Sequence, residues 1–357
     1  MLESQRPAQG DEAILPQSGA LRRLVAVLRG LRNGAKAFVR LLGRRKERRE
    51  VTTILVTGAS AGIGLELAKL LYDSPHRLVL TARRSSLARF AQEGILAGER
   101  VMLLPLDVTS DEERRAVVSA VERRWGGIDV LVNNAGISYR AVAEHITEAE
   151  RLAQLDSNFL GPMELIKLAL PHMRTQRYGR IINVSSVGGM TAMPTMSIYS
   201  ASKFALEGAS ESLWYEMRPF NVRVSIVRPG FINSDGFRKV RFTEQGQKAL
   251  TDPADPYHAH YANMDELIEG LMTLTFYTPQ DVAETIQDVI EQKNPPLWVA
   301  GTLDAYLFNT LRRLLPSGLY HRLLYAGLPR IWRWGQPSGS TNNGPLSSMP
   351  PARDRKR

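Results

Sequence analysis

The chain has 357 residues, no cysteine and a formal net charge of +10. The absence of cysteine excludes disulfide scaffolds and thiol catalysis, and it fits a reducing compartment. The sequence contains no run of about 18 uncharged apolar residues, so no ordinary transmembrane helix is predicted, and arginines interrupt the apolar N-terminal stretch that a secretory signal would need.

Patterns typical of strands and helices alternate along the core of the chain. Such an order predicts an α/β fold with a Rossmann-like, doubly wound parallel sheet. Strands are expected at 52–57, 77–82, 101–105, 128–132, 180–184, 222–227 and 297–300, and helices at 62–73, 111–124, 151–175, 199–217 and 279–292. The segment at about 234–278 is long for a loop and is expected to form a lid of short helices.

The positive charge is concentrated at the two ends. Residues 1–50 contain twelve Lys/Arg against five Asp/Glu, and residues 310–357 contain nine against one, so the core between them is mildly acidic. The length suits one core with extensions. We therefore expect a domain at 51–300, a basic amphipathic extension at 1–50, an apolar-basic segment at 301–335 and a disordered tail at 336–357.

A glycine-rich turn, Thr57-Gly58-Ala59-Ser60-Ala61-Gly62-Ile63-Gly64, follows the first expected strand and leads into an amphipathic helix. Strand, glycine turn and helix form the first half of a dinucleotide-binding unit. Gly58 permits the tight turn, while Gly62 and Gly64 let backbone amides and the helix N-terminus approach a pyrophosphate. A plain glycine loop is the alternative, and the strand–helix context favours dinucleotide binding.

The end of the second expected strand bears on the choice of cofactor. An NAD site usually has an acid there, but this chain has Ala82 followed by Arg83 and Arg84. Arg83 can bind a 2′-phosphate, since no carboxylate repels it. A solvated arginine pair is the alternative, and the sequence favours NADP(H).

Polar residues also follow two later strands. Asn133-Asn134-Ala135-Gly136 comes after one, and Ser185-Ser186 after another. Asparagine side chains there can tie neighbouring strands together and shape the floor of a cofactor site, although an Asx turn describes the same local geometry. Ser186 lies at the edge of the sheet where chemistry is expected.

Tyr199 and Lys203 are four residues apart in a predicted helix, so their side chains leave the same face one turn apart. A phenol has a pKa of about 10, and a nearby ammonium group lowers it. The pair is a candidate general acid/base.

With these motifs in this order, residues 51 to 300 resemble the short-chain dehydrogenase/reductase family, which carries TGxxxGxG, NNAG, a serine, YxxxK and a Pro-Gly pair at matching distances. The resemblance implies a catalytic tetrad of Asn158, Ser186, Tyr199 and Lys203. Tyr199 would be the acid/base, and Ser186 would orient the substrate oxygen. Lys203 would bind the nicotinamide ribose and lower the pKa of Tyr199, and Asn158 would hold a water in the proton relay.

The resemblance also implies the residues that bind the cofactor, with Asp107 at the adenine amino group. The set is Gly58, Ser60, Gly62, Ile63, Gly64, Arg83, Asp107, Val108, Asn134, Ala135, Gly136, Tyr199, Lys203, Pro229 and Gly230. No metal is expected, because the one close histidine pair, His258 and His260, is interpreted as solvated in a loop.

The terminal segments mix leucine with arginine. Leu21, Leu24, Val25, Leu28 and Leu31 share one helical face, which is typical of a helix lying on an anionic membrane. The C-terminal segment has Trp and Tyr beside Arg, as at a membrane interface. Packing on the core, a dimer contact and a nucleic-acid patch are the alternatives, and nucleic acid is not expected as a partner. The expected location is cytoplasmic, either free or peripheral on a membrane surface.

These features predict an NADP(H)-dependent oxidoreductase that interconverts a carbonyl and an alcohol on a lipophilic substrate. Apolar side chains of the lid, together with Tyr139, Met190, Met193 and Met196, are candidates for an adaptable apolar pocket. The overall look is similar to family members that act on steroids, retinoids and long-chain lipids. A soluble 3-oxoacyl reductase and a cofactor-binding interaction protein at a membrane surface are the alternatives. The family resemblance also makes a homodimer or homotetramer plausible, through the helices at 151–175 and 199–217.

Overall fold

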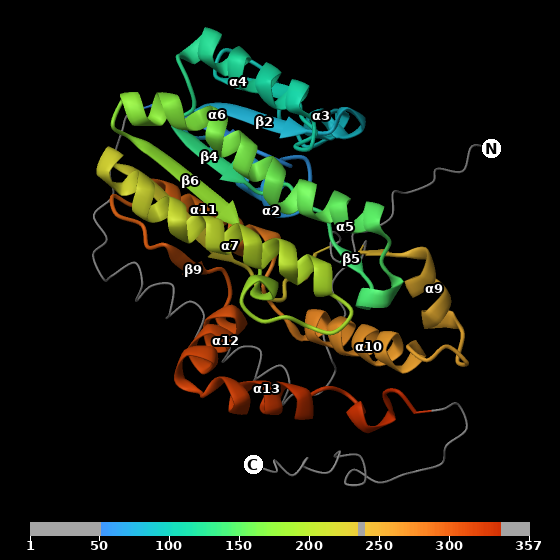
Figure 1. Cartoon of the computed structure of the whole chain (residues 1–357). Helices are drawn as coiled ribbons and strands as arrows, with labels where there is room; N and C mark the ends of the chain where they lie inside the picture. Colours follow the sequence, from blue (N-terminus) through green and yellow to red (C-terminus); the bar gives the residue numbers. More distant parts are fainter. Residues whose placement is uncertain (1–50, 235–239, 337–357) are drawn as a thin grey trace, which may run out of the picture. The chain divides into compact units, whose positions relative to one another are not determined.

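A seven-stranded parallel sheet organises the computed structural model, which describes residues 51–234 and 240–336 (Figure 1). Its order is β3-β2-β1-β4-β6-β7-β9, so the chain reverses its direction of winding between β1 and β4. Ligands of open α/β sheets bind at such a switch point. The strands are β1 (Thr53–Val56), β2 (Arg77–Ala82), β3 (Val101–Pro105), β4 (Val130–Asn133), β6 (Gly179–Val184), β7 (Val222–Arg228) and β9 (Trp298–Ala300).

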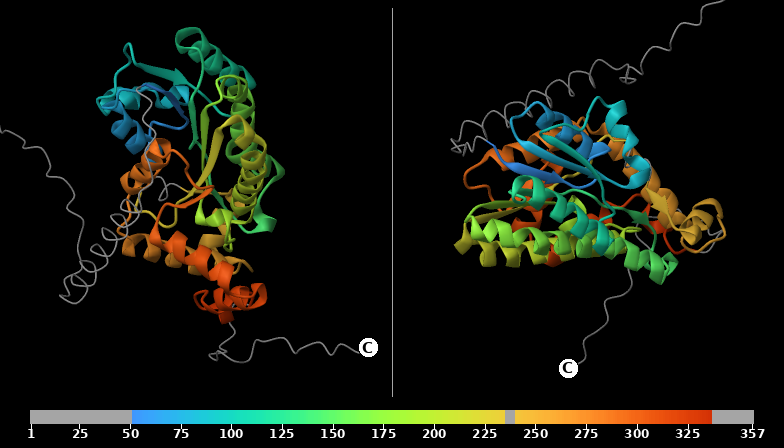
Figure 2. Two further views of the ribbon diagram at one scale, coloured as in Figure 1. Left: turned by 90° about the vertical axis from the view of Figure 1, so that its left-hand side faces the viewer. Right: turned by 90° about the horizontal axis from the view of Figure 1, so that it is seen from above.

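Helices cover both faces of this sheet (Figure 2). One apolar cluster joins the sheet to α2 (Gly62–Tyr72) and α11 (Pro279–Glu291), and a second joins it to α4 (Asp111–Trp125), α6 (Gly161–Thr175) and α7 (Ser197–Met217). Within β1, Ile54 and Val56 belong to the first cluster and Leu55 to the second, as the alternation of a strand requires. The predicted Rossmann-like fold is confirmed.

The expected helix at 151–175 is divided into three parts. α5 (Glu148–Leu155) begins at a capping box formed by Thr147 and Glu150, and a π-helical turn (Asp156–Leu160) separates it from α6. A π-turn inside a helix commonly marks a functional position. Here it contains Asn158. The structure also has a short helix, α3 (Ala88–Gln92), and 3₁₀ turns at 84–86, 143–145, 187–189, 218–220 and 331–333.

The expected lid contains α9 (Glu244–Thr251) and α10 (His258–Leu274). It is fastened to the core by a small parallel pair, β5 (Tyr139–Arg140) with β8 (Arg241–Phe242), and by an ion pair between Arg140 and Asp265. The prediction of a solvated histidine loop is wrong: His258 and His260 begin α10 and are half-buried, and the ring of His260 packs 4.6 Å from that of Trp334.

Two further helices, α12 (Leu303–Leu314) and α13 (Ser317–Ala326), follow the last strand. Figure 1 shows them on the same side of the domain as α10, and Phe308, Leu328 and Trp334 pack into a cluster with Met264 and Ile268 of that helix. Within the described ranges, none of the helices has the length and the apolar run needed to cross a membrane. The expected N-terminal helix and disordered tail lie outside the described residues, and the expected domain boundaries stay predictions.

Gly64 should be intolerant of a side chain. A Cβ there would meet the carbonyl oxygen of Gly58 at 2.4 Å and Nδ2 of Asn134 at 2.5 Å. We expect Gly64→Ala to destabilise the fold by about 1–3 kcal/mol in urea unfolding, the usual cost of overpacking. The matched control is Gly208→Ala, inside α7 with open space around its Cβ position, which should stabilise the fold by about 0.5–1 kcal/mol. Equal effects of the two variants would contradict this account of Gly64.

Candidate active site

A cavity of about 450 Å³ lies at the carboxyl ends of the strands. Residues following β1, β2, β3, β4, β6 and β7 all reach it, because parallel strands end at the same edge of the sheet. Gly64 and Asn158 are the two predicted site residues that do not line it. The others do: Gly58, Ser60, Gly62, Ile63, Arg83, Asp107, Val108, Asn134, Ala135, Gly136, Ser186, Tyr199, Lys203, Pro229 and Gly230.

The glycine turn is held against the end of β4 by Asn134. Its Nδ2 donates to the carbonyl oxygens of Thr57 and Gly58 at 2.9 and 3.2 Å, while Thr57 Oγ1 accepts from the backbone N–H groups of Asn134 and Ala135, both at 3.0 Å. The turn is therefore fixed before any ligand arrives. Gly64 packs under this turn, whereas Gly62 lines the cavity with a φ of +55°.

Asparagine side chains also tie neighbouring elements together, as the sequence predicts. Asn133 Nδ2 donates to Asn183 Oδ1 at 2.8 Å, and Asn183 Nδ2 donates to Ser210 Oγ of α7 at 2.8 Å. All three residues are buried, where a satisfied hydrogen bond is worth more than at the surface. This chain of contacts fixes α7 relative to β4 and β6.

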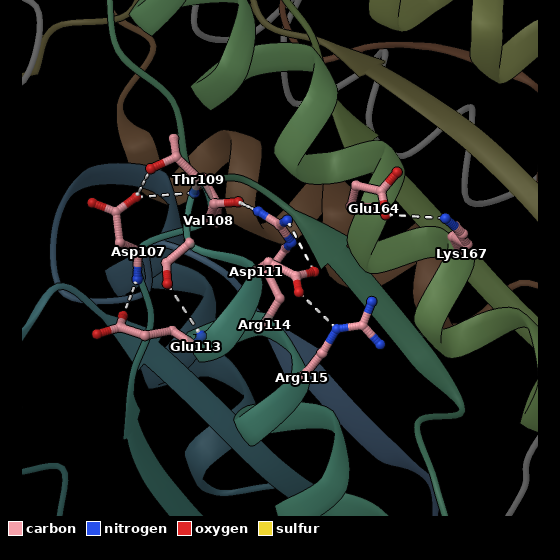
Figure 3. A network of polar contacts seen from close by, with 10 residues as sticks. Asp107, Val108, Thr109, Asp111, Glu113, Arg114, Arg115, Glu164 and Lys167 are labelled. Carbon is pink, nitrogen blue, oxygen red and sulfur yellow. Dashed lines mark hydrogen bonds and ion pairs between the residues drawn. The ribbon is translucent and has the colours of Figure 1, made fainter.

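One end of the cavity combines basic and acidic side chains. Arg83, Ser86, Arg89 and Asp107 all line it. Figure 3 shows Asp107, whose Oδ1 accepts from the backbone N–H and the hydroxyl of Thr109 at 3.0 and 2.7 Å. Burial acts to raise the pKa of Asp107, but the Thr109 bonds and the nearby Arg83 and Arg114 outweigh it, so the pKa is lowered.

Sequence reasoning missed Ser86 and Arg89, because they follow the second strand in a 3₁₀ turn and a short helix that were not predicted. The neighbouring Arg84 does not line the cavity. Its Nε donates to Glu113 Oε1 at 3.2 Å, and its side chain is 74% exposed. The two consecutive arginines thus have different surroundings.

Tyr199 lies in the first turn of α7, half-buried at the cavity wall. Burial raises the pKa of its phenol, and a hydrogen bond with Ser186 lowers it. Lys203 Nζ lies 6.0 Å from the centre of the Tyr199 ring and donates to the carbonyl oxygen of Val184 at 2.9 Å. In this structure Ser186, rather than Lys203, opposes the effect of burial, and the expected influence of Lys203 on the phenol stays a prediction.

The Lys203 ammonium is itself buried. Burial lowers its pKa to about 8, and the charge of Glu207 acts in the opposite direction. Because Glu207 is one helical turn further along α7, the residues Tyr199, Lys203 and Glu207 share one face of the helix. That four-residue spacing is the signal by which Glu207 could have been found in the sequence.

Glu207 is the centre of a buried polar cluster. Ser185 Oγ donates to Glu207 Oε1 at 2.6 Å, and Arg228 Nε donates to the two carboxylate oxygens at 3.0 and 3.1 Å. These partners are located at the ends of β6 and β7. A buried carboxylate is costly without such partners. The cluster therefore holds the Glu207 carboxylate within one helical turn of Lys203.

The side chain of Asn158 does not line the cavity but binds the backbone of the loop after β4. Its Oδ1 accepts from the N–H of Ile137 at 2.8 Å, and its Nδ2 donates to the carbonyl oxygen of Ile137 at 2.9 Å and to Ser202 Oγ at 3.0 Å. Both amide hydrogens are thus used by protein atoms. The side chain holds the loop after β4 against α7, and the predicted relay water stays a prediction.

The predicted methionine pocket is not part of this cavity. Met190 and Met196 are buried, and Met193 packs into the cluster of Phe231, Met264 and Met272. None of the three methionines lines the cavity.

Ser186 and Tyr199 lie side by side at the cavity wall, since a Cβ at Gly188 would meet Cε1 of Tyr199 at 2.9 Å and Oγ of Ser186 at 3.5 Å. Both hydroxyls can therefore reach one oxygen atom of a substrate. The raised pKa of Tyr199 keeps its proton on at neutral pH, so the phenol can act as a proton donor. The arrangement suits chemistry in which charge develops on a carbonyl or hydroxyl oxygen.

Comparison with known proteins agrees with this geometry. The profile described as short chain dehydrogenase matches residues 52–245. The chain belongs to this family, and it is an oxidoreductase acting on CH–OH and C=O groups. It is 35% identical over 277 residues to 3-ketodihydrosphingosine reductase of Bacteroides thetaiotaomicron, a match that covers 76% of this chain and 97% of the relative. It is also 35% identical over 295 residues to human retinol dehydrogenase 8, covering 79% and 93%.

Solved structures share the fold. A short-chain dehydrogenase from Streptomyces avermitilis is 31% identical, with a TM-score of 0.66 over 77% of this chain and 96% of its own. A family member from Burkholderia phymatum, solved in complex with NAD, is 23% identical with a TM-score of 0.60, over 74% of this chain and 93% of its own. This second likeness concerns the fold alone.

Removal of the Glu207 charge should move the pH dependence of turnover. Lys203, with a pKa of about 8, loses its charge as the pH rises through that value, and Glu207 holds the pKa up. In Glu207→Gln the ammonium should be lost at lower pH, so the alkaline fall in kcat should begin at lower pH than in the wild type. The measurement is kcat from pH 6 to 10.

Ser185→Ala is the matched control for this test, since it removes one hydrogen bond to Glu207 and leaves the carboxylate charge. It should keep the alkaline limb in place. A Glu207→Gln profile that is lowered equally at every pH would show that Glu207 only supports the fold.

Proposed function

We propose that the protein is an NADP(H)-dependent oxidoreductase that interconverts a carbonyl and an alcohol on a lipophilic substrate, with Tyr199 as the acid/base. The observation that carries this proposal is that Tyr199 and Ser186 lie side by side at the wall of a cavity that the glycine turn also lines. A proton donor and a second hydroxyl therefore lie in the same cavity as the glycine turn.

The residues present fit a dinucleotide. No side chain caps the N-terminus of α2, and its first residues, Gly62 and Ile63, line the cavity. Backbone N–H groups of a helix N-terminus favour a pyrophosphate. Lys203 would hold the nicotinamide ribose, and Asn134, Ala135 and Gly136 would form the floor of the cofactor site. A bound nicotinamide supplies or accepts the hydride.

This chain's own part is to position the substrate and move a proton. In the reductive direction Tyr199 gives its phenolic proton to the carbonyl oxygen, while Ser186 donates a hydrogen bond to the same oxygen. The phenolate left on Tyr199 is favoured by the ammonium of Lys203, which is largely protonated at pH 7 because its pKa is about 8. In the oxidative direction the proton returns to Tyr199.

NADP(H) is proposed over NAD(H) because of the side chains at and after the end of β2. Ala82 places no carboxylate at the end of this strand, and Arg83, Ser86 and Arg89 line the wall. A 2′-phosphate would receive charge-assisted hydrogen bonds from such a group. Reduction is then the proposed physiological direction.

A lipophilic ketone, aldehyde or alcohol is proposed as the substrate. The names of two relatives, a 3-ketodihydrosphingosine reductase and a retinol dehydrogenase, refer to substrates with long apolar chains. Apolar side chains of the loop after β7, the lid and α12 pack into one cluster, among them Phe231, Met272 and Phe308. A peripheral position on a membrane surface would suit such a substrate, and homo-oligomerisation is proposed from the family resemblance alone.

The test is a turnover assay of the full chain with NADPH, followed by nicotinamide absorbance. The apolar substrates are long-chain 3-keto amines, retinals and steroid ketones. Water-soluble 3-oxoacyl thioesters are the comparison set. Turnover of the apolar set supports the proposal. Preference for the 3-oxoacyl set would favour the fatty-acid alternative, and NADPH binding without any turnover would favour an interaction protein.

Tyr199→Phe keeps the ring and removes the proton. Its kcat should fall by at least about 10²-fold, the scale of a lost general acid/base. NADPH affinity should stay nearly unchanged, because the phenol acts on the substrate oxygen. The measurements are steady-state turnover and NADPH fluorescence titration, and a variant that retains wild-type turnover would remove Tyr199 from this role.

Arg83→Ala should weaken NADPH binding about ten- to a hundredfold, because a charge-assisted contact is worth about 1.5–3 kcal/mol, while NADH binding should change little. Arg84→Ala is the matched control, since it removes an adjacent arginine that is turned toward Glu113. Titration of both cofactors into both variants checks this. Equal losses for the two arginines, or a wild type that prefers NADH, would contradict the assignment of Arg83.

A further inference from the structure

The segment formed by α12 and α13 has two different sides, and its inner side is fixed to loops of the active site. Thr302 Oγ1 accepts from the N–H of Gly230 at 2.9 Å, and Asp304 Oδ2 accepts from the N–H of Phe231 at 2.8 Å. Both donors belong to the loop after β7, which lines the cavity through Gly230. A Cβ at Gly230 would lie 1.9 Å from Oδ2 of Asp304, so the Asp304 carboxylate packs directly against the Gly230 backbone.

Further contacts extend this inner side to the other active-site elements. Asn309 Oδ1 accepts from Arg228 Nη1 at 3.2 Å, which connects α12 with the Glu207 cluster. The hydroxyls of Tyr320 and Thr191 share a buried hydrogen bond of 2.6 Å. Arg312 lies over the ring of Phe204 on α7 at 5.5 Å. The segment is thus part of the frame around the site.

The outer side of α12 is apolar and exposed. Ala305 is the one buried residue of this helix, and the opposite face carries Leu303, Leu307 and Leu314, the last two 52% and 76% exposed. α13 continues the surface: Tyr320 is buried, while Leu319 and Leu323 are exposed one turn apart. Single exposed leucines are ordinary, but a group of them on two successive helices marks an interaction surface. We call it the outer face, and it comprises Leu303, Tyr306, Leu307, Leu311, Leu314, Leu319 and Leu323.

The charge around the outer face is positive. Residues 303–336 contain five arginines and one acid, Asp304, whose carboxylate is used on the inner side. Arg313 and Arg322 are exposed, one on each helix. Leucines with arginines at their border match an anionic lipid surface, which accepts apolar side chains below its headgroups and attracts cations to them.

Charge also decides between the possible occupants. A second copy docked through the same face would bring two arginine-rich borders together. The N-terminal segment 1–50, with twelve Lys/Arg against five Asp/Glu, would likewise meet a surface of its own sign. An anionic membrane is the occupant whose charge is complementary.

We propose that the outer face of α12 and α13 docks on an anionic lipid surface. The inner side of the same segment contacts the loops after β6 and β7. Docking of the outer face would therefore bring the active site close to the membrane. The benefit of this arrangement rests on the proposed lipophilic substrate, since such a molecule partitions into the bilayer. The docking itself depends only on the residues of the outer face.

The test is co-sedimentation of the full chain with phosphatidylcholine vesicles that contain or lack phosphatidylserine, at low and at high salt. The wild type should bind the anionic vesicles and lose affinity in high salt. Leu307→Glu combined with Leu314→Glu should reduce the partition coefficient at least about tenfold, because two apolar anchors become anions. Arg313→Gln combined with Arg322→Gln should reduce it by about tenfold and weaken its salt dependence.

Leu96→Glu combined with Leu152→Glu is the matched control. These leucines are 59% and 53% exposed but lie outside α12 and α13, so the same change of charge and apolar area there should leave vesicle binding at the wild-type level. NADPH affinity, measured without vesicles, should be the same in all variants and shows that each is folded.

The proposal is overturned if the wild type stays in the supernatant with anionic vesicles at low salt, or if the Leu307/Leu314 variant binds as the wild type does. It is also overturned if that variant lowers the molecular mass in solution while the vesicles bind nothing, because a second copy then covers the outer face. Vesicle binding is read without any substrate, so its failure is distinguishable from failure of the proposed reductase activity.

Discussion

Seven strands that all run in the same direction impose the main constraint on this protein. Their carboxyl ends meet at one edge of the sheet, so loops far apart in the chain converge there. A residue that directly follows any of these strands therefore lies close to the residues that follow the other strands. The glycine turn, the asparagines after β4, the serines after β6 and the Pro-Gly pair after β7 line one cavity for this reason.

The meeting of the strand ends does not by itself fix the positions of these loops. Buried hydrogen bonds fix them. Asn134 fixes the glycine turn on one side, and the contacts from Asn133 through Asn183 to Ser210 fix α7 on the other. Each buried amide is costly unless it is paired. The arrangement that pairs these amides is therefore strongly preferred over displaced ones. Tyr199 is held in place because it lies on α7.

The Glu207 cluster joins the chemistry to the C-terminal helices. Its carboxylate influences the charge of Lys203, its partner Arg228 reaches Asn309 on α12, and α12 holds the loop after β7. A segment that looks like an appendage in the sequence is thus tied into the frame around the site. Its inner contacts fix it to the domain, while its outer leucines are exposed.

The local sequence determined the positions of the strands and the spacing of the catalytic pair, because these features depend on neighbouring residues alone. Alternating apolar runs and turn residues predicted the strand positions closely, and the four-residue spacing of Tyr199 and Lys203 predicted their common face. What the sequence could not determine was set by contacts between distant segments. The π-turn at Asn158, the burial that lowers the pKa of Lys203, the different surroundings of Arg83 and Arg84, and the two sides of α12 all depend on which elements pack together. Burial and charge are properties of the assembled neighbours, so only the tertiary structure decided them.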